Sequence, residues 1–191
     1  MFVNSVWKYA TQKMILRRKA QGRDGPVVIW VDEFQQFVNS HDSHFLAQCR
    51  SHRGCMVMLT QSIHSIMGAM RGENARSLAL SLIGNAGHKV FHSCDADTAR
   101  YASELLGREE RTKISGNLQP AEDAWEEMFG TPKISTSFSN QWEAVLEPNV
   151  FMTLRTGGPQ NGYQADAIVI KNGEPFPGGG NWRFCTFDQR S

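Results

Sequence analysis

Apolar residues in this chain gather into continuous runs, separated by stretches where they recur every three or four positions. Two runs stand out, VVIWV at residues 27–31 and CMVMLTQ at residues 55–61. An unbroken apolar run of this length is typical of a strand buried on both faces of a parallel sheet. A third, shorter strand is predicted at residues 89–92.

Helical periodicity surrounds these runs. The predicted helices cover residues 6–17, 42–52, 62–70, 74–83 and 95–106. Asp95 is the expected N-cap of the last helix, Gly107 its end, and Gly54 the end of the second. Strands that alternate with helices are typical of βαβ units. The sequence therefore predicts an α/β fold with a mostly parallel sheet.

A single domain over residues 1–191 is expected, with four parts. Residues 1–24 form an N-terminal helix and linker, and residues 25–107 form the α/β core. Residues 108–149 are a polar insertion with a short helix around 121–128 and no strong strand. Residues 150–191 form short antiparallel strands and turns, and Trp182, Phe184 and Phe187 are placed in a terminal strand that packs back on the domain.

The overall composition and charge exclude few functions, so any case for nucleic-acid binding must rest on local clusters of charge. Twenty Lys and Arg against nineteen Asp and Glu leave a net charge of +1, which neither favours nor excludes nucleic acid. No stretch approaches the roughly 18 to 20 apolar residues of a membrane span. The four cysteines form no CxxC pair, so a cytoplasmic chain with free thiols is expected. Arg108, Arg111 and Lys113, interleaved with Glu109 and Glu110, indicate a solvated loop, with a DNA-contacting loop as the alternative.

Two adjacent carboxylates, Asp32 and Glu33, end the first apolar run. Four apolar residues followed by Asp-Glu at a strand end are the Walker B arrangement of P-loop ATPases. Asp32 would hold Mg²⁺ through a bound water, and Glu33 would activate the water that attacks the γ-phosphate of ATP. The alternative is a strand end that simply enters a solvated loop.

Two further residues lie where such a site needs them. The next predicted strand ends in Thr60-Gln61, and Gln61 would sense the γ-phosphate. Arg50, near the end of the intervening helix, would reach a neighbouring subunit's nucleotide as an arginine finger. The alternatives are that Gln61 caps a helix and that Arg50 is a solvated helix residue.

These residues stand in segments that resemble a known family. VVIWVDEFQQF, CRSHRGCMVMLTQSIHSI, IGNAGHKVFHSCDADTARYASELLG and LRTGGPQNGYQADAIVIKNGEPF are similar, in order, to the motor domain of conjugative coupling proteins, the TraD/TraG group of type IV secretion ATPases. The resemblance implies a RecA-like motor in a hexameric ring at the cytoplasmic face of the bacterial inner membrane. It implies ATP and Mg²⁺ as cofactors, and DNA, relaxase and secretion-channel proteins as partners.

The sequence departs from that family in one respect that bears on chemistry. No G-x-x-x-x-G-K-[ST] occurs, and the family's membrane anchor is not found either. Without that loop there are no backbone amides and no lysine to hold phosphates. We therefore expect no ATP hydrolysis by this chain unaided, and self-association or partner capture through an open strand edge. Alternatives are a non-catalytic adaptor and the motor of an FtsK/HerA-like double-stranded DNA pump.

Overall fold

The computed structural model describes residues 2–19, 25–70, 74–118 and 134–190. Within residues 115–118 and 134–137 it describes the backbone alone. Its helices are α1 (Phe2–Arg17), α2 (Ser40–Gln48), α3 (Ile63–Ala69), α4 (Ala75–Asn85), α5 (Ala96–Leu106) and α7 (Pro148–Met152), with 3-10 turns η1 (Phe34–Gln36), η2 (Cys49–His52) and η3 (Pro159–Asn161). Its strands are β1 (Val27–Val31), β2 (Gly54–Met58), β3 (His88–Phe91), β4 (Arg108–Leu118), β5 (Ile134–Ala144), β6 (Gln164–Lys171) and β7 (Trp182–Asp188).

Strands β1 and β2 lie side by side and run parallel, with residues 27–31 opposite residues 54–58. Their pairing confirms the two predicted neighbours. The prediction that β1 is buried on both faces is wrong, because Trp30 is 70% exposed while Val31 is buried. Alternate residues of β1 face the core, and the described residues leave the other face of the strand accessible.

The prediction of a mostly parallel sheet is also wrong. β3 does not join β1 and β2, but pairs antiparallel with β6, and β6 pairs antiparallel with β7. β6 is the central strand, with Ala167, Ile168 and Ile170 buried. The predicted antiparallel strands at the C-terminus are therefore confirmed, and they take β3 as their third member. Residues 151–158, expected to be extended, instead begin in α7.

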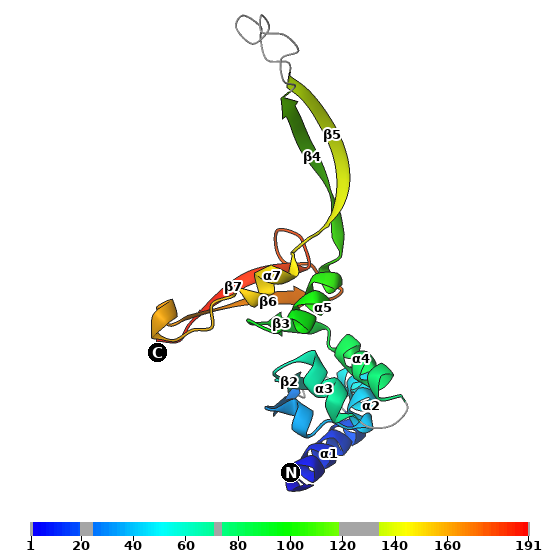
Figure 1. Ribbon diagram of the computed structural model, residues 1–191. Coiled ribbons are helices and arrows are strands. Elements are labelled where there is room, and N and C mark those ends of the chain that lie inside the picture. The colour runs from blue at the N-terminus through cyan, green and yellow to red at the C-terminus, as the bar shows by residue number, and fades with distance from the viewer. Residues whose placement is uncertain (1, 20–24, 71–73, 119–133, 191) are drawn as a thin grey trace, which may run out of the picture.

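Residues 108–149 contain the longest strands of the described chain, contrary to the prediction of a polar insertion without a strong strand. β4 and β5 form an antiparallel hairpin, with Arg108 opposite Ala144 and Leu118 opposite Ile134. The hairpin projects away from the rest of the molecule (Figure 1). Its charged residues hide the strand signal, because an exposed ribbon needs no apolar run. The helix expected around 121–128 lies outside the described residues.

Two apolar cores hold the molecule together. The first lies among α1 to α4, β1 and β2, and contains the fully buried Phe34, Phe45 and Leu82. The second lies among α5, α7, β3 and β6, and contains Phe151 and Ile168. No helix within the described ranges is both long and apolar enough to cross a membrane.

α1 is a helix, as predicted, but it is anchored by polar side chains. Lys8 and Gln12 are buried and donate to the two carboxylate oxygens of Asp42, at 2.5 Å and 2.7 Å. The same carboxylate accepts from the backbone N–H of Asn39 at 2.8 Å, in the capping box of α2. Burial lowers the pKa of Lys8, and the nearby Asp42 opposes that shift. The cluster thus ties α1 to the start of α2.

Substituting Asp42 by alanine removes the acceptor of two buried donors. A buried charge that loses its partner costs about 3–5 kcal/mol, so we expect Asp42→Ala to lower the free energy of unfolding in urea by that amount. His44→Ala, an exposed position on the same helix, is the control and should change it by less than about 0.5 kcal/mol. Equal effects of the two variants would contradict the role of the cluster.

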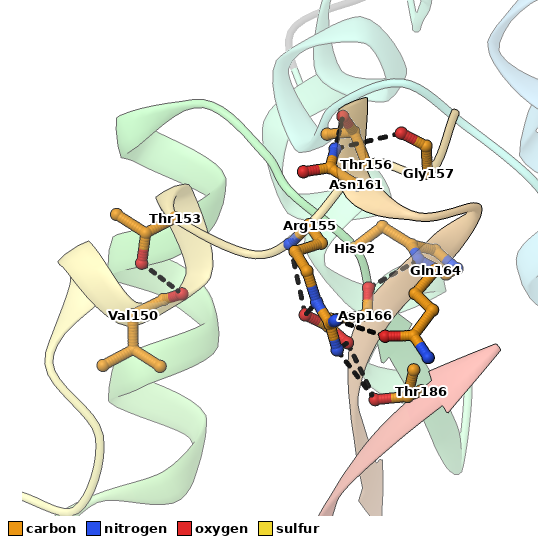
Figure 2. A network of polar contacts seen from close by, with 10 residues as sticks. All are labelled: His92, Val150, Thr153, Arg155, Thr156, Gly157, Asn161, Gln164, Asp166 and Thr186. Atoms are coloured by element: carbon orange, nitrogen blue, oxygen red, sulfur yellow. Dashed lines mark hydrogen bonds and ion pairs between the residues drawn. The ribbon is translucent and has the colours of Figure 1, made fainter. Parts of the chain in front are cut away.

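A second polar network fastens the C-terminal sheet (Figure 2). The Arg155 guanidinium donates to both oxygens of Asp166, at 2.7 Å and 2.8 Å, and Thr186 Oγ1 donates to the same carboxylate at 2.8 Å. His92 Nδ1 lies 2.9 Å from the backbone oxygen of Asp166. The network joins the chain after α7 to β6, β7 and the end of β3. The hydrogen bonds from Arg155 hold the pKa of Asp166 at about 2.

The lowered pKa of Asp166 predicts a pH dependence. An aspartate with a pKa of 3.8 when unfolded and about 2 when folded contributes stability above about pH 4, which is lost as the pH falls toward 2. We expect the melting temperatures of wild type and Asp166→Asn to differ by a constant amount from pH 5 to 7, and to converge below pH 4. Glu174→Gln, which removes an exposed and longer pair with Lys171, is the control and should have little effect. A difference that persists unchanged at pH 2 would refute this role.

Candidate functional site

The two predicted carboxylates lie directly after β1, at the carboxyl end of the parallel strand pair. Asp32 is exposed, and its Oδ1 accepts a hydrogen bond from the backbone N–H of Glu33 at 2.9 Å. Glu33 adopts a left-handed backbone conformation, with φ 48° and ψ 46°. For a residue other than glycine this conformation costs roughly 1–2 kcal/mol. Such a conformation persists only where the surroundings enforce it.

Contacts of the residues next to Glu33 hold it in this left-handed conformation. Phe34 is fully buried in the first core, and its N–H donates to the carbonyl of Leu59 at 2.8 Å. The N–H of Leu59 in turn donates to the carbonyl of Val31 at 3.0 Å. These bonds fix the turn after β1 against the chain that leaves β2. The Glu33 side chain is therefore positioned by the same contacts that hold the strand ends together.

Four polar side chains meet at this edge. Gln61 Nε2 lies 3.3 Å from each carboxylate oxygen of Glu33, and Gln35 Nε2 donates to Glu33 Oε2 at 2.5 Å. Thr60 Oγ1 donates to Gln35 Oε1 at 2.9 Å. The structure thus brings together Glu33 and Gln61, which were predicted from two separate strand ends. The sequence analysis missed Gln35, whose only signal is its place two residues after Glu33.

Arg50 lies elsewhere. It is exposed in η2, which precedes β2, so it lies at the amino end of the strand pair while Glu33 and Gln61 lie at the carboxyl end. A strand of five residues spans about 16 Å. Arg50 is thus too far away to contact a ligand at this edge of the same chain. The structure therefore does not bring Arg50 together with Glu33 and Gln61.

The donor set at the edge suits a hydrated cation that is bound together with a phosphate. Asp32 Oδ2 has no partner among the residues that the structure describes, so it is available to a metal-bound water. Mg²⁺ is typically held through one or two carboxylates, several waters and substrate phosphates, not by a full protein cage. The described ranges contain no group of three or more His, Cys, Asp or Glu side chains that could hold a metal ion by themselves. The carboxylates therefore fit a magnesium–nucleotide complex.

The site is connected to α5. Ser62 caps α3, where its Oγ accepts from the N–H of Ser65 at 3.1 Å. The N–H of Ile63 donates to Thr98 Oγ1 at 3.3 Å, and Thr98 Oγ1 donates to Asp95 at 2.7 Å. Burial works against ionisation of Asp95, but the hydrogen bonds from Thr98 outweigh it and lower the pKa. Asp95 is the predicted N-cap, so the segment that carries Gln61 is hydrogen-bonded to the first turn of α5.

The far end of α5 joins the hairpin. Ser103 Oγ donates to the carbonyl of Leu146 at 2.6 Å, and the N–H of Val145 donates to the carbonyl of Gly107 at 3.1 Å. Gly107 ends α5 with φ 79°, a value that favours glycine, and β4 begins at the next residue. One helix thus links the strand-end site to the base of the β4–β5 hairpin.

Comparison with known proteins places this arrangement in a family. Residues 26–155 match the family described as the TraM recognition site of TraD and TraG. The bacterial conjugative coupling protein TrwBdeltaN70, in its unbound monoclinic form, shares the fold with a TM-score of 0.61 at 14% identity. The plasmid coupling protein TrwB, in complex with the non-hydrolysable GTP analogue GDPNP, shares it with a TM-score of 0.60 at 15% identity.

Each structural match covers 95% of this chain, and the chain spans 35% of each coupling protein. No curated protein matches it. At these identities the structural likeness shows the fold alone. The family match is more specific, because it covers more than half of the chain and includes Asp32, Glu33, Arg50 and Gln61. The chain belongs to the TraD/TraG family of conjugative coupling proteins.

Proposed function

We propose that this chain carries the Walker B and sensor half of the nucleotide site of a RecA-like motor that couples DNA and protein substrates to a type IV secretion channel. One observation carries the proposal. Glu33 is fixed at a parallel strand end with both carboxylate oxygens 3.3 Å from the Gln61 amide, in a member of the coupling-protein family. A carboxylate paired with an amide at such an edge suits activation of water next to a phosphate.

Each residue has a distinct role in this proposal. Asp32 would hold Mg²⁺ through a bound water, and the ion would neutralise charge at the phosphates. Glu33 orients and polarises the attacking water. Gln61, whose amide nitrogen lies 3.3 Å from both carboxylate oxygens of Glu33, would respond to the presence of the γ-phosphate. Gln35 donates to the Glu33 carboxylate and Thr60 donates to Gln35, so the two residues restrain the position of that carboxylate.

The sequence has no P-loop motif. In this proposal the backbone amides and the lysine that bind the phosphates therefore come from outside these 191 residues. The fold relatives support this reading, since the chain spans about a third of their length and one of them is in complex with a GTP analogue. ATP is the proposed nucleotide. In the complete assembly we propose a hexameric ring at the cytoplasmic face of the inner membrane, with DNA and relaxase as cargo.

The first test is catalytic. We expect the purified 191-residue chain to hydrolyse MgATP only at background rate. In the complete gene product that contains these residues, Glu33→Gln should lower kcat by roughly 100- to 10,000-fold and leave nucleotide affinity nearly unchanged. Gln36→Ala, an exposed neighbour, is the control and should retain activity.

Two results would count against the proposal. The first is ATP hydrolysis by the isolated chain that is lost on Glu33→Gln substitution. It would show that the 191 residues bind the phosphates without groups from another segment. Near-normal turnover of Glu33→Gln in the complete protein would remove Glu33 from the mechanism. If no flanking reading frame supplies a P-loop, the motor is excluded and the non-catalytic adaptor function takes its place.

The second test concerns Arg50. If Arg50 acts on the neighbouring subunit's nucleotide, Arg50→Ala and Glu33→Gln should each abolish turnover in the complete protein. A 1:1 mixture of the two variants should regain a measurable fraction of wild-type activity, because some interfaces then combine an intact Glu33 with an intact Arg50. A mixture as inactive as its components, with mixed rings demonstrated by crosslinking, would place Arg50 outside the chemistry.

A further inference from the structure

Gln61 lies on a short irregular connection between β2 and α3. Residues 59–62 belong to neither element, and Gln61 is exposed on this connection. Its Nε2 lies 3.3 Å from each carboxylate oxygen of Glu33. Most N–H···O bonds in proteins are shorter, at about 2.9 Å. The contact between Gln61 and Glu33 therefore depends on how firmly the two ends of the connection are held.

The end next to β2 is held through the main chain. The N–H of Leu59 donates to the carbonyl of Val31 at 3.0 Å, and the carbonyl of Leu59 accepts from the N–H of Phe34 at 2.8 Å. Both bonds belong to the backbone, so they do not depend on the identity of one polar side chain. This end of the connection is fixed by the strand pair itself.

The end next to α3 is held by one side chain of another helix. Ile63 is the first residue of α3, and the first N–H groups of a helix have no acceptor within that helix. The N–H of Ile63 donates to Thr98 Oγ1 in the first turn of α5 at 3.3 Å. Both residues are buried, and a buried N–H that loses its acceptor is costly. The Thr98 hydroxyl is therefore the anchor of this end.

Asp95 sets the direction of that hydroxyl. Thr98 Oγ1 donates to Asp95 Oδ2 at 2.7 Å, while Asp95 Oδ1 accepts from the N–H groups of Asp97 and Thr98, at 3.1 Å each. A hydroxyl has one hydrogen to donate and two lone pairs that accept. Because the hydrogen is directed to the carboxylate, the lone pairs of Thr98 Oγ1 remain available for the N–H of Ile63.

A second contact between α3 and α5 is exposed. His64 Nε2 lies 2.8 Å from Asp97 Oδ2, and the two side chains are 60% and 50% exposed. Exposed polar pairs of this kind contribute little to stability, because water competes for both partners. His64 also lies one residue farther from Gln61 than Ile63 does. The buried bond to Thr98 is therefore the contact with α5 that bears most directly on Gln61.

We propose that Thr98 is a positioning residue for Gln61. The inference rests on the proposed function, because it concerns the place of the Gln61 amide beside Glu33 during nucleotide hydrolysis. Loss of the Thr98 hydroxyl removes the acceptor of the Ile63 N–H and lets the α3 end of the connection shift. Thr98 touches neither Glu33 nor the nucleotide in this proposal, and acts only through the segment that carries Gln61.

The first test uses the isolated chain without nucleotide and measures hydrogen exchange of the Ile63 amide by NMR. Thr98→Val keeps the shape of the side chain without its hydroxyl, so exchange should accelerate at least about 10-fold. Thr98→Ser keeps the hydroxyl and should exchange within about 2-fold of wild type. Thr98→Ala is a second variant without the hydroxyl and should behave as Thr98→Val does.

Ser103→Ala is the matched control. Ser103 is as buried as Thr98 on the same helix, and its hydroxyl donates to the carbonyl of Leu146 at 2.6 Å, at the far end of α5 from Gln61. The variant also loses a buried hydroxyl, so it should lower the melting temperature as Thr98→Val does. Exchange of the Ile63 amide should stay as in wild type.

The second test measures hydrolysis by the complete gene product. A displacement of about 1 Å at a reacting group can cost on the order of 100-fold in rate, so we expect a partial shift of Gln61 in Thr98→Val to lower kcat roughly 10-fold. KM should stay nearly unchanged, because the substrate contacts remain. Thr98→Ser and Ser103→Ala should keep kcat within about 2-fold of wild type.

Four results would overturn the proposal, and Glu33→Gln measured alongside tells them apart. Unchanged exchange at Ile63 in Thr98→Val would show that the hydroxyl is not the anchor. Faster exchange with a normal kcat, while Glu33→Gln abolishes turnover, would leave the proposed function standing and remove Thr98 from it. Equal losses of kcat in Thr98→Val and Ser103→Ala would reduce the effect to general destabilisation. Near-normal turnover of Glu33→Gln would refute the proposed function and this inference with it.

Discussion

The local structure of the site depends on two backbone hydrogen bonds. They join the residue that follows β2 to the two ends of the turn that follows β1. Leu59 donates to the carbonyl of Val31 and accepts from the N–H of Phe34, while the Phe34 ring is sealed in the first core. A buried aromatic ring and two backbone hydrogen bonds thus fix the turn that carries Glu33. The Glu33 carboxylate is held by this packing and by contacts with the Gln35 and Gln61 amides, with no ion-pair partner among the residues that the structure describes.

Sequence patterns predicted the parts of the fold that local physics decides. The apolar runs of β1 and β2, the cap at Asp95 and the polar strand ends at Glu33 and Gln61 all follow from a few neighbouring residues. Strand pairing does not, so β3 was placed in the wrong sheet. The hairpin was missed because an exposed ribbon needs no apolar run, and Gln35 because a turn, not a spacing, brings it to Glu33.

Helix α5 connects the strand-end site with the β4–β5 hairpin. The segment that carries Gln61 is bonded to the first turn of α5, and the last turn of α5 is bonded to the base of the hairpin. The strand-end site and the base of the hairpin are therefore attached to one and the same helix.

The left-handed backbone of Glu33 has a consequence for the evolution of the chain. Asparagine and glycine adopt that conformation more readily than glutamate, so either residue would relieve the local penalty. Both lack the carboxylate to which the proposed function assigns the activation of water. Under that proposal, selection for stability and selection for activity favour different residues at this one position. A lineage that abandons nucleotide chemistry should drift there toward asparagine or glycine, and that drift would be readable in sequences long before the fold itself changed.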